Sequence, residues 1–356
     1  MNDNPGSLIF IPDITGFTRF VNETEIKHGQ HIISELLEIL IQSNRLGMKV
    51  SEVEGDAVLF YKEGTVPHVN ELLGQARTMF LKFHNHLQAY ETRRMCHCGA
   101  CTSAHNLSLK FIVHQGEIGF TNILNRIKPY GAEIVLGHKL LKNSIDVPEY
   151  ILFSEKYFEQ LGDLDRGELP LGQGSDEYLD VGRVDYRYVT LTPLKQHLDP
   201  PGKPPLPPKS SKPVIKSIVI DRLLDDVYQV IIELDLRLLW NRKVDRLDFE
   251  PGRVNRIGTR HTCLFPLGRV EFQTVQNEFE KDTRVYGEEV LDAPFASKMF
   301  IYYVLTPVDQ STGVRVELHL FPKSIIGWIM APLLKFRFKK QIGVSILSLK
   351  KLLETS

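Results

Sequence analysis

The hydrophobic and polar positions before residue 199 alternate between stretches typical of strands and stretches typical of helices. Four short segments predict strands: 8–11 is apolar, 48–53 and 57–61 flank a turn, and 107–114 alternates between apolar and polar residues. Three longer segments carry apolar residues every three or four positions, which predicts helices at 26–46, 66–94 and 134–141. Such a mixed order is typical of an α/β domain.

After residue 213 the order of elements changes. A strand at 214–220 and a helical segment at 223–239 precede a series of strand-like stretches from 244 to 321. Within that series, residues 314–320 alternate strictly between apolar and polar positions. One long helical segment, apolar on several sides, closes the chain at 324–353. Taken together, the two halves predict the α+β class.

A proline-rich stretch separates the two halves. Seven of the fourteen residues from 200 to 213 are proline, a composition that favours an extended polyproline spacer. The alternative is a docking motif, because 204–208 also fits the pattern of an SH3 ligand. We therefore expect domains at 1–198 and 214–356, joined by a linker at 199–213.

Composition and charge narrow the classes of function. Hydrophobic residues make up 42% of the 356 and charged residues 24%, as in globular proteins, and the net charge of -1 gives no reason to expect a nucleic-acid partner. No secretory signal is recognisable, and the longest apolar stretch, 325–334, is too short for a transmembrane segment. Three of the four cysteines lie within six positions, unlike a secreted disulfide framework. These features predict a cytoplasmic protein.

Two aspartates are the first candidates for chemistry. Asp13 ends the first predicted strand and is followed by Gly16, while Asp56 lies in a turn between two strands. Carboxylates at the ends of neighbouring strands can share a divalent cation, and turn amides before a helix can receive phosphate oxygens. The alternative is structural, with Asp13 as a helix cap and Asp56 as an ordinary turn residue.

Three motifs resemble those of the class III adenylate and guanylate cyclases. The segment Asp13–Thr18 (DITGFT) is similar to their opening motif, and 54–57 (EGDA) falls where their second metal aspartate is expected. The segment 113–117 (VHQGE) resembles their His-x-Gly turn, and 131–141 takes the place of their Asn- and Arg-bearing helix. The resemblance spans about residues 8–193. It implies a ferredoxin-like α/β sandwich and a homodimer.

The resemblance also implies roles for single residues. Asp13 and Asp56 would hold Mg or Mn with ATP or GTP, and Glu52 and Lys128 fall at the two base-reading positions. The backbone of one turn would line the phosphates, namely that of Ile14, Thr15, Gly16, Phe17 and Thr18. Lys139 falls where the family has a transition-state arginine.

The helix that should complete the cyclase site departs from the family pattern. Val135 falls at the position of the ribose-orienting asparagine and offers no side-chain donor, and Lys139 lacks the planar fork of arginine. The resemblance therefore predicts metal–nucleotide binding without efficient turnover. The alternatives are an active cyclase and a catalytically dead scaffold.

A cysteine-rich segment is the second candidate site. Cys96, Cys98 and Cys101, with His105 four residues further on, offer three thiolates and an imidazole, the ligand types of a tetrahedral zinc site. The alternative is a loop of small residues with incidental thiols.

The order of elements in 214–356 resembles the START-like superfamily, also called SRPBCC or helix-grip, which includes polyketide cyclases and lipid-transfer proteins. The segment 256–259 is similar to its early glycine-containing strand. The resemblance implies a START-like helix-grip domain that binds a hydrophobic small molecule or lipid. No catalysis is expected there, because His261 and His319 lack recognisable catalytic partners.

The terminal helix leaves two alternatives open. Its apolar residues can be plain core instead of ligand contacts. Lys335, Arg337, Lys339 and Lys340, beside Phe336 and Phe338, can be a solvated face or a stripe that lies on a membrane surface.

The pairing of the two domains resembles a bacterial family. It predicts a signalling or regulatory protein with a divergent metal–nucleotide-binding domain and a hydrophobic-ligand-binding domain.

Overall fold

The computed structural model describes residues 6–124, 126–158, 164–199, 202–266, 268–276, 282–293 and 296–355. Its chain divides into two compact units, which we describe separately. The first comprises residues 1–91 and 98–201, and the second comprises 92–97 and 202–356. Residues 202–213 of the predicted linker form no helix or strand, and Pro200 and Pro201 lie outside the described residues.

The first unit is built on a seven-stranded sheet in the order β2-β3-β1-β4-β7-β9-β8. All neighbouring strands are antiparallel except β4 and β7. The strands are β1 (Ser7–Thr15), β2 (Lys49–Glu54), β3 (Ala57–Lys62), β4 (Ser108–Gly116), β7 (Tyr150–Ser154), β8 (Leu171–Tyr178) and β9 (Gly182–Thr190). A separate two-stranded ribbon joins β5 (Gly119–Ile123) to β6 (Arg126–Tyr130).

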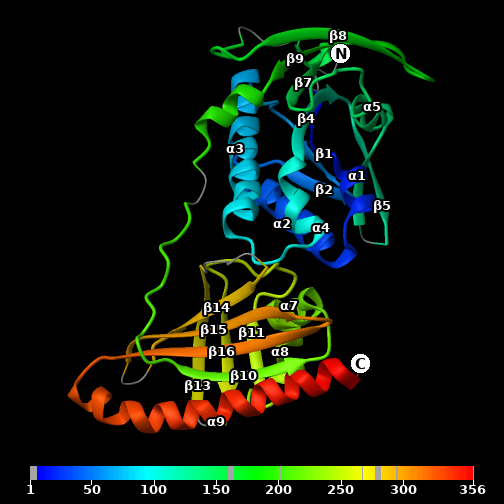
Figure 1. Cartoon of the computed structure of the whole chain (residues 1–356). Helices are drawn as coiled ribbons and strands as arrows, with labels where there is room; N and C mark the ends of the chain where they lie inside the picture. The colour runs from blue at the N-terminus through cyan, green and yellow to red at the C-terminus, as the bar shows by residue number, and fades with distance from the viewer. Residues whose placement is uncertain are drawn as a thin grey trace. The chain divides into compact units, whose positions relative to one another are not determined.

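Helices cover both faces of this sheet, which explains why β1 is apolar almost throughout. Residues of α5 pack with Ile9 and Ile11 on one face, and Figure 1 shows α2 and α3 on the other side of the sheet. The opposite face of β1 carries Phe10, whose ring contacts Phe60 and Phe111. The helices are α1 (Phe17–Glu23), α2 (Ile26–Gln42), α3 (Val69–Arg93), α4 (Gly99–Ser103), α5 (Ala132–Leu140) and α6 (Glu155–Phe158), with short 3-10 turns at Ala104–Asn106 and Thr192–His197.

The second unit contains a fully antiparallel seven-stranded sheet in the order β10-β16-β15-β14-β13-β12-β11. Its strands are β10 (Val214–Ile220), β11 (Arg246–Phe249), β12 (Arg260–Phe265), β13 (Gly268–Val275), β14 (Arg284–Leu291), β15 (Ala296–Val308) and β16 (Ser311–Pro322). Its helices are α7 (Leu224–Ile232), α8 (Arg237–Trp240) and α9 (Ile325–Thr355), with a 3-10 turn at Leu234–Leu236. The long helix α9 packs along β10 and β16, as Figure 1 shows.

The chain is thus a mixed α+β protein, as the sequence predicts. One predicted helix was too long: 26–46 ends at Gln42. Asn44 lies just after the C-cap residue Ser43, and its side-chain amide donates to the carbonyl of Met48 at 2.6 Å, which holds the chain in a turn. Gly47 then adopts a φ of 64°, which favours glycine. Among the described residues, no helix is both long and apolar enough to cross a membrane.

Candidate metal and nucleotide site

Asp13 lies on β1, an interior strand of the first sheet. In the two antiparallel pairings of this strand it stands opposite Ala57 on β3 and Lys110 on β4. Only 11% of its side chain is exposed. Burial raises the pKa of Asp13, because a carboxylate loses hydration when the strand is covered.

Asp56 lies in the two-residue turn that joins β2 to β3. Gly55 before it has a φ of 61°, which only glycine adopts readily. The amide of Ile14 donates to the carbonyl of Asp56 at 3.0 Å and fastens the turn to β1. Burial raises the pKa of Asp56, and the negative charge of Asp13 raises it further. The two carboxylates therefore lie within electrostatic range of each other.

Lys110 is a site residue that sequence reasoning missed. Its ammonium lies 3.3 Å from Asp13 Oδ2 and donates to the carbonyl of Leu141 at 2.9 Å. Its positive charge lowers the pKa of Asp13, against the larger effect of burial. The signal in the sequence was a single lysine inside an otherwise apolar strand, and its meaning depends on the pairing of β4 with β1.

The predicted phosphate turn, Ile14–Thr18, begins in the last two residues of β1 and ends in the first residues of α1. Gly16 has a φ of 90° and begins α1, while Thr15 Oγ1 donates to the carbonyl of Pro148 at 3.3 Å. The ring of Phe17 lies 3.7 Å from where a Cβ on Gly55 would stand, so the turn packs against the Asp56 turn. Gly16 and Thr18 are exposed to solvent.

The two residues predicted to read the base contact each other. Lys128 on β6 donates to Glu52 Oε2 on β2 at 2.6 Å. Each side chain therefore already has a charged partner, and a base would have to compete for both. Glu54 and His138, on β2 and α5, lie close to Glu52 and form with it a second group of possible metal ligands, in which only Glu54 is exposed.

The predicted transition-state helix is α5. Lys139 donates to the carbonyl of Leu179 at 2.7 Å, in the turn between β8 and β9. Val135 is 51% exposed and brings no polar group to this surface. Lys139 thus uses one of the three donors of its ammonium on a backbone carbonyl, which fixes the position of its charge.

The His114–Gly116 motif has a structural explanation. His114 is buried, and its two ring nitrogens lie 2.6 Å from Ser154 Oγ and 2.6 Å from Glu133 Oε2. The hydrogen bond from His114, with that from Lys156, lowers the pKa of Glu133 to about 2. A Cβ on Gly116 would lie 2.3 Å from Glu133 Cγ, so only glycine leaves room for this link.

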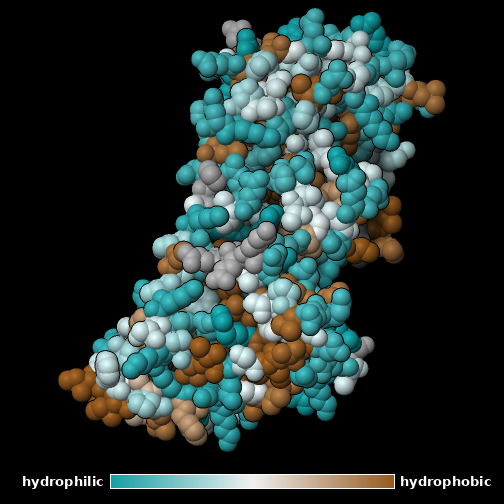
Figure 2. Space-filling view, in the orientation of Figure 1, coloured by the Kyte–Doolittle hydropathy of each residue, from teal (hydrophilic) through white to brown (hydrophobic). Residues whose placement is uncertain are grey.

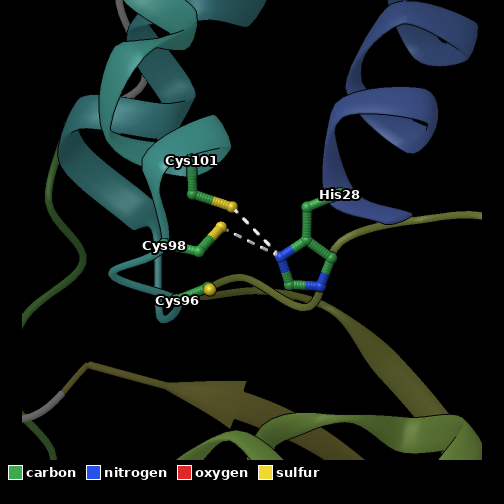
Figure 3. A group of neighbouring side chains, drawn as sticks. All are labelled: His28, Cys96, Cys98 and Cys101. Atoms are coloured by element: carbon green, nitrogen blue, oxygen red, sulfur yellow. Dashed lines mark hydrogen bonds between the residues drawn. The ribbon is translucent and has the colours of Figure 1, made fainter. Parts of the chain in front are cut away.

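The cysteine-rich segment brings together a set of residues different from the one predicted. Cys96, Cys98 and Cys101 are grouped with His28 of α2, as Figure 3 shows. His105 lies in the 3-10 turn after α4 and is not part of the group. The sequence spacing suggested His105 because it is near along the chain, whereas the fold brings in a helix about seventy residues earlier.

The second unit contains a cluster of buried polar side chains. Arg237 of α8 forms two hydrogen bonds with Glu288 of β14, at 2.6 and 3.1 Å. Tyr286 donates to Glu288 at 2.7 Å, and His261 Nε2 lies 3.4 Å from the same carboxylate. Burial lowers the pKa of His261 to about 4, so this imidazole is neutral at pH 7.

Comparisons with known proteins match parts of the chain. Residues 33–150 match the model of a family described as a protein of unknown function (DUF2652). The chain is 28% identical over 161 residues to the uncharacterized protein Rv2561/Rv2562 of Mycobacterium tuberculosis, which covers 43% of this chain and 75% of that protein.

Several solved structures resemble part of the chain at low sequence identity. The catalytic core of a rhodopsin-guanylyl cyclase with converted specificity, in complex with ATPalphaS, is 17% identical, covers 52% of this chain and 96% of its own, and has a TM-score of 0.40. The guanylate cyclase domain of RhGC from Catenaria anguillulae, in complex with GTP, is 18% identical, covers 52% of this chain and 97% of its own, and has a TM-score of 0.38. Truncated norcoclaurine synthase from Thalictrum flavum is 11% identical, covers 42% of this chain and 96% of its own, and has a TM-score of 0.34. TM-scores below 0.5 assign no function, so the site is judged on its own residues.

Proposed function

We propose that residues 1–198 form a divergent class III cyclase-like domain that binds a nucleoside triphosphate together with Mg or Mn. The observation that carries the proposal is the electrostatic interaction between the carboxylates of Asp13 and Asp56. Asp13 lies on β1, Asp56 lies in the turn before the neighbouring strand β3, and the exposed turn at Gly16 is close by. Hard cations prefer carboxylate oxygens, and turn amides suit phosphate.

The two carboxylates fit a divalent cation electrostatically. Burial and mutual repulsion raise the pKa of Asp56, and burial raises that of Asp13. A cation bound between them would offset both effects and supply the charge that a triphosphate requires. Lys110 already supplies one positive charge to Asp13, so a cation must share or displace it.

The same geometry favours binding over turnover. Val135 has no side-chain donor, and Lys139 is held by the carbonyl of Leu179. Losing one preorganised donor raises a reaction barrier by about 3–4 kcal/mol. We therefore propose a regulatory metal–nucleotide domain, with an active cyclase and a dead scaffold as the alternatives. Because the resemblance to cyclases implies a homodimer, we also propose that the chain forms one. Sedimentation equilibrium of the full chain tests this.

For residues 214–356 we propose a START-like domain that binds an amphipathic ligand, either a hydrophobic small molecule or a lipid. The long helix α9 lies along β10 and β16, in the arrangement that the helix-grip resemblance requires. The buried pair Arg237–Glu288, with Tyr286 and His261 beside it, gives the interior polar groups next to its apolar residues. Mass spectrometry of organic extracts from the purified chain tests this; no co-purified lipid or other apolar ligand would count against it.

A panel of nucleotides and cations tests the proposal for the first domain. We expect ATP or GTP to raise the Tm of the full chain only when Mg or Mn is present. Asp13→Asn and Asp56→Asn should abolish the shift, and Asp146→Asn, an exposed aspartate of the same unit, should keep it. Production of a cyclic nucleotide that Asp13→Ala abolishes would favour the active cyclase. No shift of Tm with any pair of nucleotide and cation would favour the catalytically dead scaffold.

A further inference from the structure

Three thiols and one imidazole gather at the start of α4. Cys98 immediately precedes this helix and Cys101 lies within it, while His28 lies in the first turn of α2. Cys96 is two residues before Cys98, so the chain itself keeps it near. One ligand atom from each of the four residues lies within 4.8 Å of all the others.

The distances match a tetrahedral metal centre. His28 Nδ1 lies 3.3 Å from Cys98 Sγ and 3.6 Å from Cys101 Sγ (Figure 3). Zinc bonds of 2.3 Å to sulfur and 2.0–2.1 Å to nitrogen give a tetrahedral S···N separation of about 3.6 Å. A single ring nitrogen has one lone pair or one hydrogen, so a hydrogen bond accounts for one of these sulfurs and a shared cation accounts for both.

Neighbouring groups hold this arrangement in place. Both oxygens of Glu25 accept hydrogen bonds from α4, one from the amide of Gly99 and one from that of Ala100, each at 3.1 Å. Glu25 is also the residue before α2, three positions from His28. One carboxylate thus fixes the cysteine turn against the helix that carries the imidazole. His28 and Cys101 are buried, which keeps water from competing for the ion.

We propose that His28, Cys96, Cys98 and Cys101 bind one zinc ion in a closed, structural site. All four positions of the tetrahedron come from the protein, as in structural rather than catalytic zinc sites. Thiolates select zinc over the hard cations proposed for Asp13 and Asp56, so the two sites are chemically distinct. Glu25 is a positioning residue for this site.

Metal analysis of the full chain, purified with a reducing agent and without chelator, tests the proposal. We expect about one zinc per chain, with loss of most of it in His28→Gln, Cys98→Ser and Cys101→Ser. Cys263→Ser and His105→Ala should keep it, since one is a buried thiol elsewhere and the other is the neighbouring histidine. Glu25→Ala should weaken zinc binding about 10- to 100-fold in competition with a chelator.

A second measurement covers variants that fail to fold. Cobalt added to the metal-free wild-type chain should give the intense visible bands of a tetrahedral thiolate site. Zinc below about a tenth of an equivalent, together with no cobalt bands, would overturn the proposal. A native mass that is two hydrogens short, with a disulfide among Cys96, Cys98 and Cys101, would also overturn it and indicate a redox cluster.

The first turns of α9 carry a second, independent signal. Six large apolar side chains there are 59–81% exposed: Ile325, Ile326, Trp328, Ile329, Leu333 and Phe336. Figure 2 shows hydrophobic residues gathered at the end of the unit where α9 begins. Four of them, at 325, 329, 333 and 336, follow helical spacing and form one stripe. We call all six residues together the α9 apolar stripe.

The charge around the stripe indicates its partner. Basic residues accompany it at Lys323, Lys335, Arg337, Lys339 and Lys340, and no acidic residue occurs from 323 to 353. Tryptophan and long basic side chains are suited to a lipid headgroup boundary. We infer that the α9 apolar stripe lies on an anionic membrane surface.

Co-sedimentation with vesicles tests this inference. The full chain should bind phosphatidylserine-containing vesicles at least about tenfold more strongly than phosphatidylcholine vesicles, and less at high salt. Trp328→Ser with Ile329→Ser should remove the binding, while Leu347→Ser, an exposed leucine further along α9, should keep it. Equal binding by wild type and double variant would overturn the inference. So would a concentration-dependent dimer that the double variant abolishes, because the stripe would then face a second copy.

Discussion

Replacing Lys110 by methionine tests how the Asp13 site accommodates positive charge. The ammonium lies 3.3 Å from Asp13 Oδ2, and the two side chains are 17% and 11% exposed. At that distance the attraction is about 5 kcal/mol for an effective dielectric constant of about 20. Desolvation offsets part of it, and removal of one partner of a buried pair typically costs about 3–5 kcal/mol. We expect Lys110→Met to lower the free energy of unfolding at pH 7 by roughly 3 kcal/mol.

The pattern of recovery identifies the cause. Without Lys110, the folded-state pKa of Asp13 rises further above its unfolded value, so the variant regains stability as the pH falls and Asp13 takes up a proton. Manganese should restore stability as well, by about 2.7 kcal/mol at a concentration 100 times its Kd. Wild type should gain less, because the cation must displace or share with Lys110.

Urea unfolding with and without manganese, at pH 5 and pH 7, measures these differences. Lys62→Met is the matched control. Lys62 lies on β3 opposite Leu8, at the other end of the β1–β3 pairing from Asp13, and donates to the carbonyl of Leu46. Lys110→Met should bind manganese at least about tenfold more tightly than wild type does, a difference in binding free energy of about 1.4 kcal/mol. Equal manganese stabilisation of wild type and Lys110→Met would refute the reasoning.

Three further perturbations test other parts of the structure. Gly116→Ala should lower Tm substantially, because its Cβ meets Glu133 Cγ at 2.3 Å and breaks the link to His114. The neutral form of His261 should stabilise the second unit above pH 6.5, an effect lost as the pH falls toward 4, so His261→Gln should flatten the dependence of Tm on pH in that window. Arg237→Met should lower the free energy of unfolding by about 3–5 kcal/mol, and adding Glu288→Met should restore most of it.

Each of these has its own control. Gly119→Ala, whose Cβ meets nothing closer than 3.5 Å, should be tolerated; an equal loss in both glycine variants would contradict the steric argument. An unchanged pH profile in His261→Gln, measured by near-UV circular dichroism, would show that another group titrates. Additive losses for Arg237→Met and Glu288→Met in urea titrations would show that the pair is not coupled.

The local features of the fold were predictable from the sequence. Period-two and helical patterns place β10 and most of α2, α3 and α9, because each element buries one face or stripe of its own residues. The Gly55–Asp56 turn was also predictable, because the positive φ of a tight turn is a local requirement that glycine meets. The START-like and ferredoxin-like descriptions of the two domains remain predictions.

The contacts between distant segments were not predictable in this way. Lys110 meets Asp13 only through the pairing of β4 with β1, and His28 reaches Cys98 only because α2 packs beside α4. Glu52 and Lys128 contact each other, and their positions along the chain do not predict that pairing; their role in reading a base stays a prediction. In each case the partner is set by register or packing across 70 or more residues, which no spacing along the chain encodes.

Calorimetric titration of the full chain with manganese and ATP or GTP tests the metal–nucleotide proposal most directly. We predict heat of binding that requires both metal and nucleotide and is lost when Asp13 and Asp56 are both changed to asparagine. Absence of heat at millimolar nucleotide, or undiminished binding by that double variant, would contradict it.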